Sequence, residues 1–148
     1  MNAYALGASS HAEGASTTAS GVCSHAEGGG TRAIGDYSHA EGESTTASGY
    51  ASHADGYSTL AAATASYAGG LGTVAGSLGQ HVFGIANEID NDGEYIEIVG
   101  GGSYNPTGIT TRHNIRTLNA AGHEWLYDGL TIAESGTLTI GETTINEE

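Results

Sequence analysis

Glycine recurs at every seventh position through the first half of the chain, and no other feature of the sequence restricts the fold as strongly. It occupies positions 7, 14, 21, 28, 35, 42, 49 and 56, then 70 and 84, with Ala63 and Ser77 at the two intervening positions. Alanine stands two residues before each of these positions from Ala5 to Ala75. A coiled coil needs two large apolar residues per heptad, and glycine destabilises helices, so this period is not helical.

The true repeat unit is 14 residues long and consists of two similar halves. Four residues before the glycine position, serine and threonine alternate without interruption from Ser10 to Thr73. The next position is histidine in every second half, with an acidic residue two positions later. These pairs are His11–Glu13, His25–Glu27, His39–Glu41 and His53–Asp55. Two halves per unit predict one coil of a β-solenoid, with two short strands and two turns.

Alternation along each strand predicts which residues face inward. The serine or threonine, alanine and glycine positions share one face of the strand, because successive side chains point to opposite sides. All of them are small, which predicts a narrow interior where two backbones approach closely. The histidine and its acidic neighbour then point outward. Two-residue turns are expected between the strands at Ala15-Ser16, Gly29-Gly30 and Asp36-Tyr37.

These repeats resemble the heads of trimeric autotransporter adhesins. One motif is also similar to repeats in tail-associated proteins of phages and prophages of Gram-positive bacteria. It is Ser-His-Ala-Glu-Gly at 10–14, 24–28 and 38–42, and Ser-His-Ala-Asp-Gly at 52–56. The resemblance covers residues 1 to about 84. It implies a left-handed parallel β-roll in which three chains pack side by side.

The pattern stops after Gly84, and residues 85–148 read as a second, irregular β segment. Strands are expected at 94–99, 115–118 and 123–126, and short alternating strands at 130–132, 138–140 and 144–145. Asp92-Gly93 predicts a hairpin turn. The run 112–118 before 121–125 is similar to a recurring module of phage tail proteins. The predicted fold is thus all-β: a trimeric left-handed parallel β-roll over 1–84, then a short-stranded fibre or tip segment over 85–148.

Composition excludes several classes of function. The 148 residues include 17 acidic residues, three arginines and no lysine, for a net charge of −14. Nucleic-acid binding is disfavoured because it needs cationic residues to neutralise phosphates, and anionic membranes are disfavoured for the same reason. No apolar run approaches the roughly 18 residues of a membrane span, and the first residues lack the features of a signal peptide.

A core made largely of alanine is thin, which favours oligomerisation. Cys23 is the one cysteine, so we expect no disulfide within the chain.

The histidines that recur every 14 residues are the one group of side chains that suggests a binding site. His11, His25, His39 and His53 would stack one coil apart, each beside a carboxylate, and imidazole and carboxylate are metal ligands. If this face meets the trimer axis, inter-chain metal sites could form. The favoured interpretation is a ladder of hydrogen-bonded His–Glu pairs that fixes register, without a metal or other cofactor. Residues 90–94 resemble part of a calcium loop but lack its distant glutamate, which again favours a hairpin turn.

No nucleophile elbow, HExxH motif or phosphate loop is present, so we expect no catalytic residues. The resemblance implies a structural and adhesive segment of a phage tail fibre or receptor-binding protein on the virion. Such a homotrimer would bind a host surface glycan or protein. His123, Trp125 and Tyr127 are candidate contacts, and the favoured alternative is that they pack at the trimer seam. The alternatives are the head of a trimeric adhesin on a bacterial surface, a glycan-cleaving tail spike with paired carboxylates, and an ice-binding array of threonines.

Overall fold

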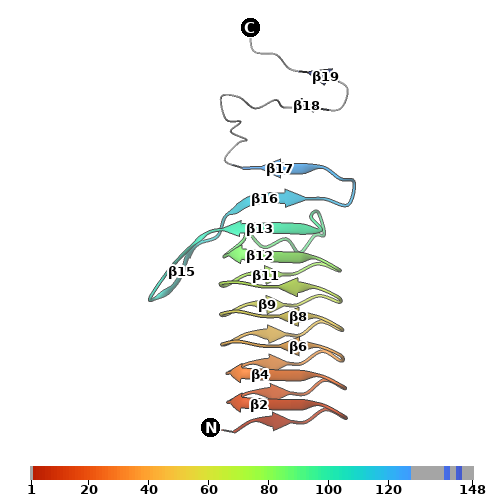
Figure 1. Cartoon of the computed structure of the whole chain (residues 1–148), viewed down its shortest axis with the longest axis vertical. Coiled ribbons are helices and arrows are strands. Elements are labelled where there is room, and N and C mark those ends of the chain that lie inside the picture. Colours follow the sequence, from red (N-terminus) through yellow and green to blue (C-terminus); the bar gives the residue numbers. More distant parts are fainter. Residues whose placement is uncertain (1, 128–138, 141–142, 145–148) are drawn as a thin grey trace.

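The computed structural model describes residues 2–127, 139–140 and 143–144. These residues form an all-β solenoid of about 7 turns. Figure 1 shows the coils stacked along the long axis of the molecule, beginning with the N-terminal coil at one end. Within the described part of the chain there is no helix long and apolar enough to span a membrane.

Each half of the repeat unit supplies one short strand, and the two halves build two sheets. The first sheet contains β1 (Tyr4–Ala5), β3 (Thr18–Ala19), β5 (Arg32–Ala33), β7 (Thr46–Ala47), β9 (Leu60–Ala61) and β11 (Val74–Ala75). The second sheet begins with β2 (His11–Ala15), β4 (His25–Gly29), β6 (His39–Ala40), β8 (His53–Ala54), β10 (Tyr67–Ala68) and β12 (His81–Ile85). Neighbouring strands of these coils are parallel and pair residues one repeat apart, as in His11 with His25.

Every corner contains a residue with positive φ at the same place in the repeat. These residues are Ser9, Ser16, Cys23, Gly30, Tyr37, Ser44, Ala51, Ser58, Ala65, Gly72, Gly79 and Ala86. The turn expected at Asp36-Tyr37 is confirmed. At the other two places the chain bends at Ser16 and Gly30, while Ala15 and Gly29 are the last residues of β2 and β4. Backbone hydrogen bonds between successive corners, such as Tyr37 N to Val22 O at 2.8 Å, offset the strain of the left-handed conformation. Cys23 lies exposed at one corner and forms no disulfide.

The interior consists of the small residues that the alternation predicts. Nine alanines from Ala19 to Ala75 are completely buried, together with the threonines and serines two residues before them. Ser24 Oγ donates to Gly21 O at 2.7 Å, whereas Thr45 Oγ1 donates to Glu41 O at 3.0 Å. The inward hydroxyls of Thr17 and Thr31 have no hydrogen-bond partner. The strict alternation of serine and threonine thus corresponds to two corners of different shape.

The second sheet continues past the sequence repeat without interruption. β13 (Glu97–Gly101) pairs parallel with β12, and His81 lies opposite Glu97. β16 (Asn114–Leu118) and β17 (Glu124–Leu126) then add antiparallel strands. The hairpin turn predicted at Asp92-Gly93 is wrong, because β12 and β13 run in the same direction. Residues 86–96 instead pass once around the stack.

Asp90 explains why this segment bends without forming a hairpin. Its carboxylate accepts hydrogen bonds from the backbone amides of residues 92, 93 and 95 at 2.9–3.1 Å, and from the Gln80 side chain at 2.9 Å. The acidic cluster that resembles a calcium loop is therefore a loop whose amides bind a carboxylate of the same chain.

Two further hairpins complete the described residues. β14 (Ser103–Asn105) and β15 (Gly108–Thr111) form an antiparallel pair that the sequence reading missed, and in Figure 1 this hairpin projects sideways from the stack. β18 (Thr139–Ile140) pairs with β19 (Thr143–Thr144), which overlap two of the predicted short strands. The strand predicted at 130–132 lies outside the described residues.

Candidate functional site

A histidine–carboxylate ladder runs up the outer face of the second sheet. It consists of His11, His25, His39 and His53 with Glu13, Glu27, Glu41 and Asp55. The parallel register places one imidazole above the next, with ring centroids 5.0, 4.7 and 4.8 Å apart. The rings of His25 and His39 are stacked almost in parallel, at an interplanar angle of 5°. The column predicted from the 14-residue spacing is thus present within one chain.

The hydrogen bonds of the ladder differ from the prediction, which paired each histidine with the acidic residue of its own coil. His11 Nε2 lies 3.6 Å from Glu13 and His25 Nε2 lies 3.8 Å from Glu27, both longer than a hydrogen bond. The hydrogen bond of 3.2 Å runs between coils, from His53 Nε2 to Glu41 Oε1. Glu41 therefore bridges two neighbouring coils, whereas Glu13 and Glu27 face the histidine of their own coil.

Three polar atoms of the ladder are buried without a hydrogen-bond partner. They are His25 Nε2, His39 Nε2 and Asp55 Oδ1. A buried polar atom without a partner costs about 1–3 kcal/mol, so such atoms usually mark a site for a water, an ion or a partner. The two imidazole nitrogens, of His25 and His39, are consequently ligand atoms whose bonding capacity the chain itself does not use, whereas Glu41 and His53 bond to each other.

His39 occupies the centre of the ladder and is held in its neutral form. Burial lowers the pKa of its imidazole, and the neighbouring His53 and His25 lower it further, while the carboxylates of Glu41 and Glu27 act in the opposite direction. The lowered pKa keeps His39 uncharged at neutral pH, so one ring nitrogen has a free lone pair.

Tyr67 ends the ladder in the fifth coil. It replaces histidine in the column, and its ring packs edge-on against His53 at 5.5 Å. Gly69 replaces the acidic residue of that coil, because a Cβ there would lie 2.5 Å from the Tyr67 hydroxyl oxygen. Burial, followed by the adjacent Asp55 carboxylate, raises the pKa of the Tyr67 phenol to about 12. His81 resumes the column beyond it, with Phe83 in the acidic position.

The three candidate contact residues near the end of the second sheet lie together in an aromatic cluster. His123, Trp125 and Tyr127 alternate along β17 and its continuation, and the rings of His123 and Trp125 are 6.0 Å apart. The sequence reading missed a fourth member, Tyr95, whose ring is 5.6 Å from Trp125 and whose hydroxyl is 3.5 Å from that of Tyr127. We call these four residues the aromatic end. Trp125 remains 39% exposed although Thr117, beside it in the sheet, is buried.

The opposite face of the same strands is charged. Arg116 donates to the carboxylates of Glu97 and Glu124, with a distance of 3.0 Å to Glu124. Leu126, also on this face, is 41% exposed. The end of the sheet therefore presents aromatic side chains on one side and ion pairs on the other.

An apolar edge follows the corners that lead from the first sheet to the second. Its large side chains are exposed by 38–76% and are Leu6, Val22, Ile34, Tyr37, Tyr50 and Leu78. The rings of Tyr37 and Tyr50, from neighbouring coils, are in edge-to-face contact at 5.4 Å. A run of exposed apolar side chains along one side of a soluble protein is typical of an interaction surface.

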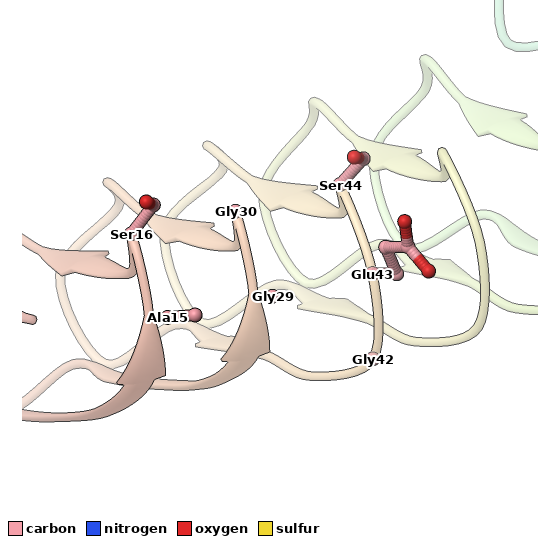
Figure 2. Close-up of a pocket in the computed structure, with 7 residues that line it drawn as sticks. All are labelled: Ala15, Ser16, Gly29, Gly30, Gly42, Glu43 and Ser44. Carbon is pink, nitrogen blue, oxygen red and sulfur yellow. The ribbon is translucent and has the colours of Figure 1, made fainter. Parts of the chain in front are cut away.

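The opposite edge carries small residues in its first coils, then Tyr57, Leu71 and Ile85, and it has open cavities. Figure 2 shows the first, where Gly29 and Gly30 leave a gap between Ala15 and Ser16 on one side and Glu43 and Ser44 on the other. Its volume is about 440 Å³. The second, of about 300 Å³, lies where the β14–β15 hairpin meets this edge at Tyr57 and Tyr104.

No protein-family model, no curated protein and no solved structure matches this chain. The assignment of function therefore depends on the geometry described above together with the resemblance of the repeats.

Proposed function

We propose that this chain is a structural and adhesive, non-catalytic segment of a homotrimeric fibre, of the kind found in phage tail fibres and receptor-binding proteins. In this proposal three left-handed rolls pack side by side on the virion tail, and the fibre contacts a glycan or protein of the host surface. The observation that carries the proposal is the apolar edge, which extends along the stack from Leu6 to Leu78.

The apolar edge supports side-by-side association of the chains, because the interior of a single roll buries little apolar surface. Its interior is filled by alanine, serine and threonine, which contribute far less apolar area than a core of leucine or isoleucine. Packing the edges of three chains together would remove large tyrosine, leucine and isoleucine side chains from water. The net charge of −14 would then keep assembled fibres apart from one another.

The mass of the chain in solution tests the assembly. We expect light scattering on a sizing column to give three times the chain mass of 14.8 kDa. Replacing Tyr37 and Tyr50 together by serine should shift the population toward monomer, because both lie on the apolar edge. The matched control replaces Tyr57 and Tyr104, two exposed tyrosines in contact on the opposite edge, and should leave the mass unchanged. A wild-type monomer would overturn the fibre proposal.

The aromatic end supports the adhesive part of the proposal. Exposed tryptophan and tyrosine rings combine a large apolar face with a polar edge, and such residues dominate the binding energy of many interfaces. Trp125 and Tyr127 are both exposed and lie on one face of β17, beside His123. A sugar ring or an apolar side chain of a receptor could stack against them.

A binding comparison on the two faces of β17 tests this part. We expect Trp125→Ala to weaken binding to bacterial surface glycans or whole cells by about tenfold or more, because the stacking face is lost. Leu126→Ala is the control, since Leu126 has similar exposure on the opposite face of the same strand. The readout is retention on a glycan array and on intact cells. Equal binding by wild type and Trp125→Ala would remove the aromatic end from the receptor contact.

A further inference from the structure

We propose that the histidine–carboxylate ladder binds a divalent transition-metal ion of the zinc class, held between β4 and β6 by Glu27, His39 and Glu41. Each of these residues offers one ligand atom, and the three atoms lie within 4.8 Å of one another. In addition, His39 Nε2 is buried and has no hydrogen-bond partner. The proposal explains this unused nitrogen, which the fold alone does not.

The ligand set favours zinc over the hard cations. Imidazole nitrogen is a preferred ligand of Zn²⁺, whereas Mg²⁺ and Ca²⁺ select sites built from oxygen alone. Ligands of one tetrahedral zinc ion lie about 3.4 Å apart, given bonds of about 2.0–2.1 Å. Since the three atoms lie within 4.8 Å of one another, each separation must close by at most about 1.4 Å. The glutamates can do so by side-chain rotation, because the side chains of Glu27 and Glu41 are 34% and 39% exposed.

The charge of the cluster favours a divalent cation. Two carboxylates and one neutral imidazole carry two negative charges, which one Zn²⁺ ion neutralises. The bound ion would also tie Glu27 of one coil to His39 and Glu41 of the next.

A second group of possible metal ligands lies one coil nearer the N-terminus. His11, Glu13 and His25 also place their ligand atoms within 4.8 Å of one another, and His25 Nε2 has no hydrogen-bond partner. This cluster is more exposed, since His11 and Glu13 side chains are 65% and 59% accessible. We expect it to bind the ion more weakly, because water competes for its ligands.

All ligands of the central site belong to one chain, so the site does not require the trimer. A monomeric mass would leave the zinc proposal intact, and absence of zinc binding would leave the fibre proposal intact. The two proposals can therefore fail separately.

Zinc titration of the whole chain, after treatment with a chelator, tests the site. The experiment uses His11→Asn as the starting protein, so that the lower cluster does not contribute. We expect saturable binding of one Zn²⁺ by calorimetry and a higher thermal midpoint that the chelator reverses. Mg²⁺ should produce neither effect. Binding should weaken as the pH is lowered from 7.5 to 5.5, because protons compete with the ion for the imidazole nitrogen.

Variants in the same background locate the ion. His39→Asn, and separately Glu27→Gln with Glu41→Gln, should each weaken binding at least about tenfold. The glutamine pair keeps the size of the side chains, so it remains informative if His39→Asn unfolds. His81→Asn is the control, because His81 lies in the same column with Phe83 in place of an acidic residue. Absence of zinc binding by the starting protein, or unchanged binding in the glutamine variant, would overturn the proposal.

Discussion

Gly28→Ala is expected to lower the free energy of unfolding by about 3 kcal/mol or more. Gly28 has a φ of +103°, a conformation that costs an alanine roughly 1–3 kcal/mol. An added Cβ would also lie 2.1 Å from the carbonyl oxygen of Gly42 in the next coil. Neither group can move away, because both belong to backbones held together by the sheet. Urea denaturation followed by circular dichroism measures the loss.

Gly29→Ala is the matched control in the same corner. The nearest atom to its added Cβ is Glu43 Cγ at 3.8 Å, an ordinary contact, and the residue does not have positive φ. We expect a change within about 0.5 kcal/mol. Equal losses at positions 28 and 29 would show that the close approach of the coils does not limit stability.

This steric requirement explains why so much of the roll could be predicted from the sequence. On the other edge a Cβ at Gly21 would lie 2.0 Å from Gly35 O, so glycine is needed there for close approach, without positive φ. The same requirement returns in successive coils, except at Ala63 and Ser77, and produces the glycine period of the sequence. The inward alanines follow for the same reason, since Ala26 and Ala40 face a space that admits no larger side chain.

The C-terminal part of the second sheet, from β12 to β17, could not be predicted in this way, because no steric requirement repeats there at a fixed spacing. Inward positions become Val82, Ile98 and Thr117, which vary in size. The register of His81 with Glu97 also lengthens the coil by two residues, so the spacing is lost. Asp92-Gly93 has the composition of a hairpin turn, but Asp90 binds the surrounding amides and the chain continues in the parallel direction.

The candidate sites were also predictable from the sequence only where they depend on the repeat. Spacing predicts that His25 and His39 stack, because register follows from the repeat. It does not predict that His53 bonds to Glu41 of the preceding coil, or that His39 Nε2 lacks a partner, because these depend on side-chain rotamers. Tyr95 joins Trp125 only through the sheet pairing of distant strands, which no local pattern encodes.

The first sheet ends at a side chain instead of a strand, and this arrangement leads to a further prediction. β11 has no strand on its outer side in the sheet order, but Asn87 takes that place. Its Oδ1 accepts from Val74 N at 2.8 Å, and its Nδ2 donates to Val74 O at 3.0 Å. Arg112 holds the segment by donating to Gly72 O and Asn87 O at 3.0 and 3.1 Å. The amide of Asn87 thus reproduces the hydrogen bonds that a next coil would make.

Asn87→Leu, which keeps the approximate shape of the side chain, is expected to cost about 2–4 kcal/mol of stability, because two backbone groups of Val74 lose their partners. Asn87 is completely buried, so water cannot replace the lost bonds without opening the end of the roll. Asn105→Leu is the control, since Asn105 bonds only within its exposed hairpin, to Thr107. Hydrogen exchange provides a second readout: the Val74 amide should lose protection in Asn87→Leu, while amides at the N-terminal coils keep theirs. If Val74 stays protected, the end of the first sheet is closed by something other than Asn87.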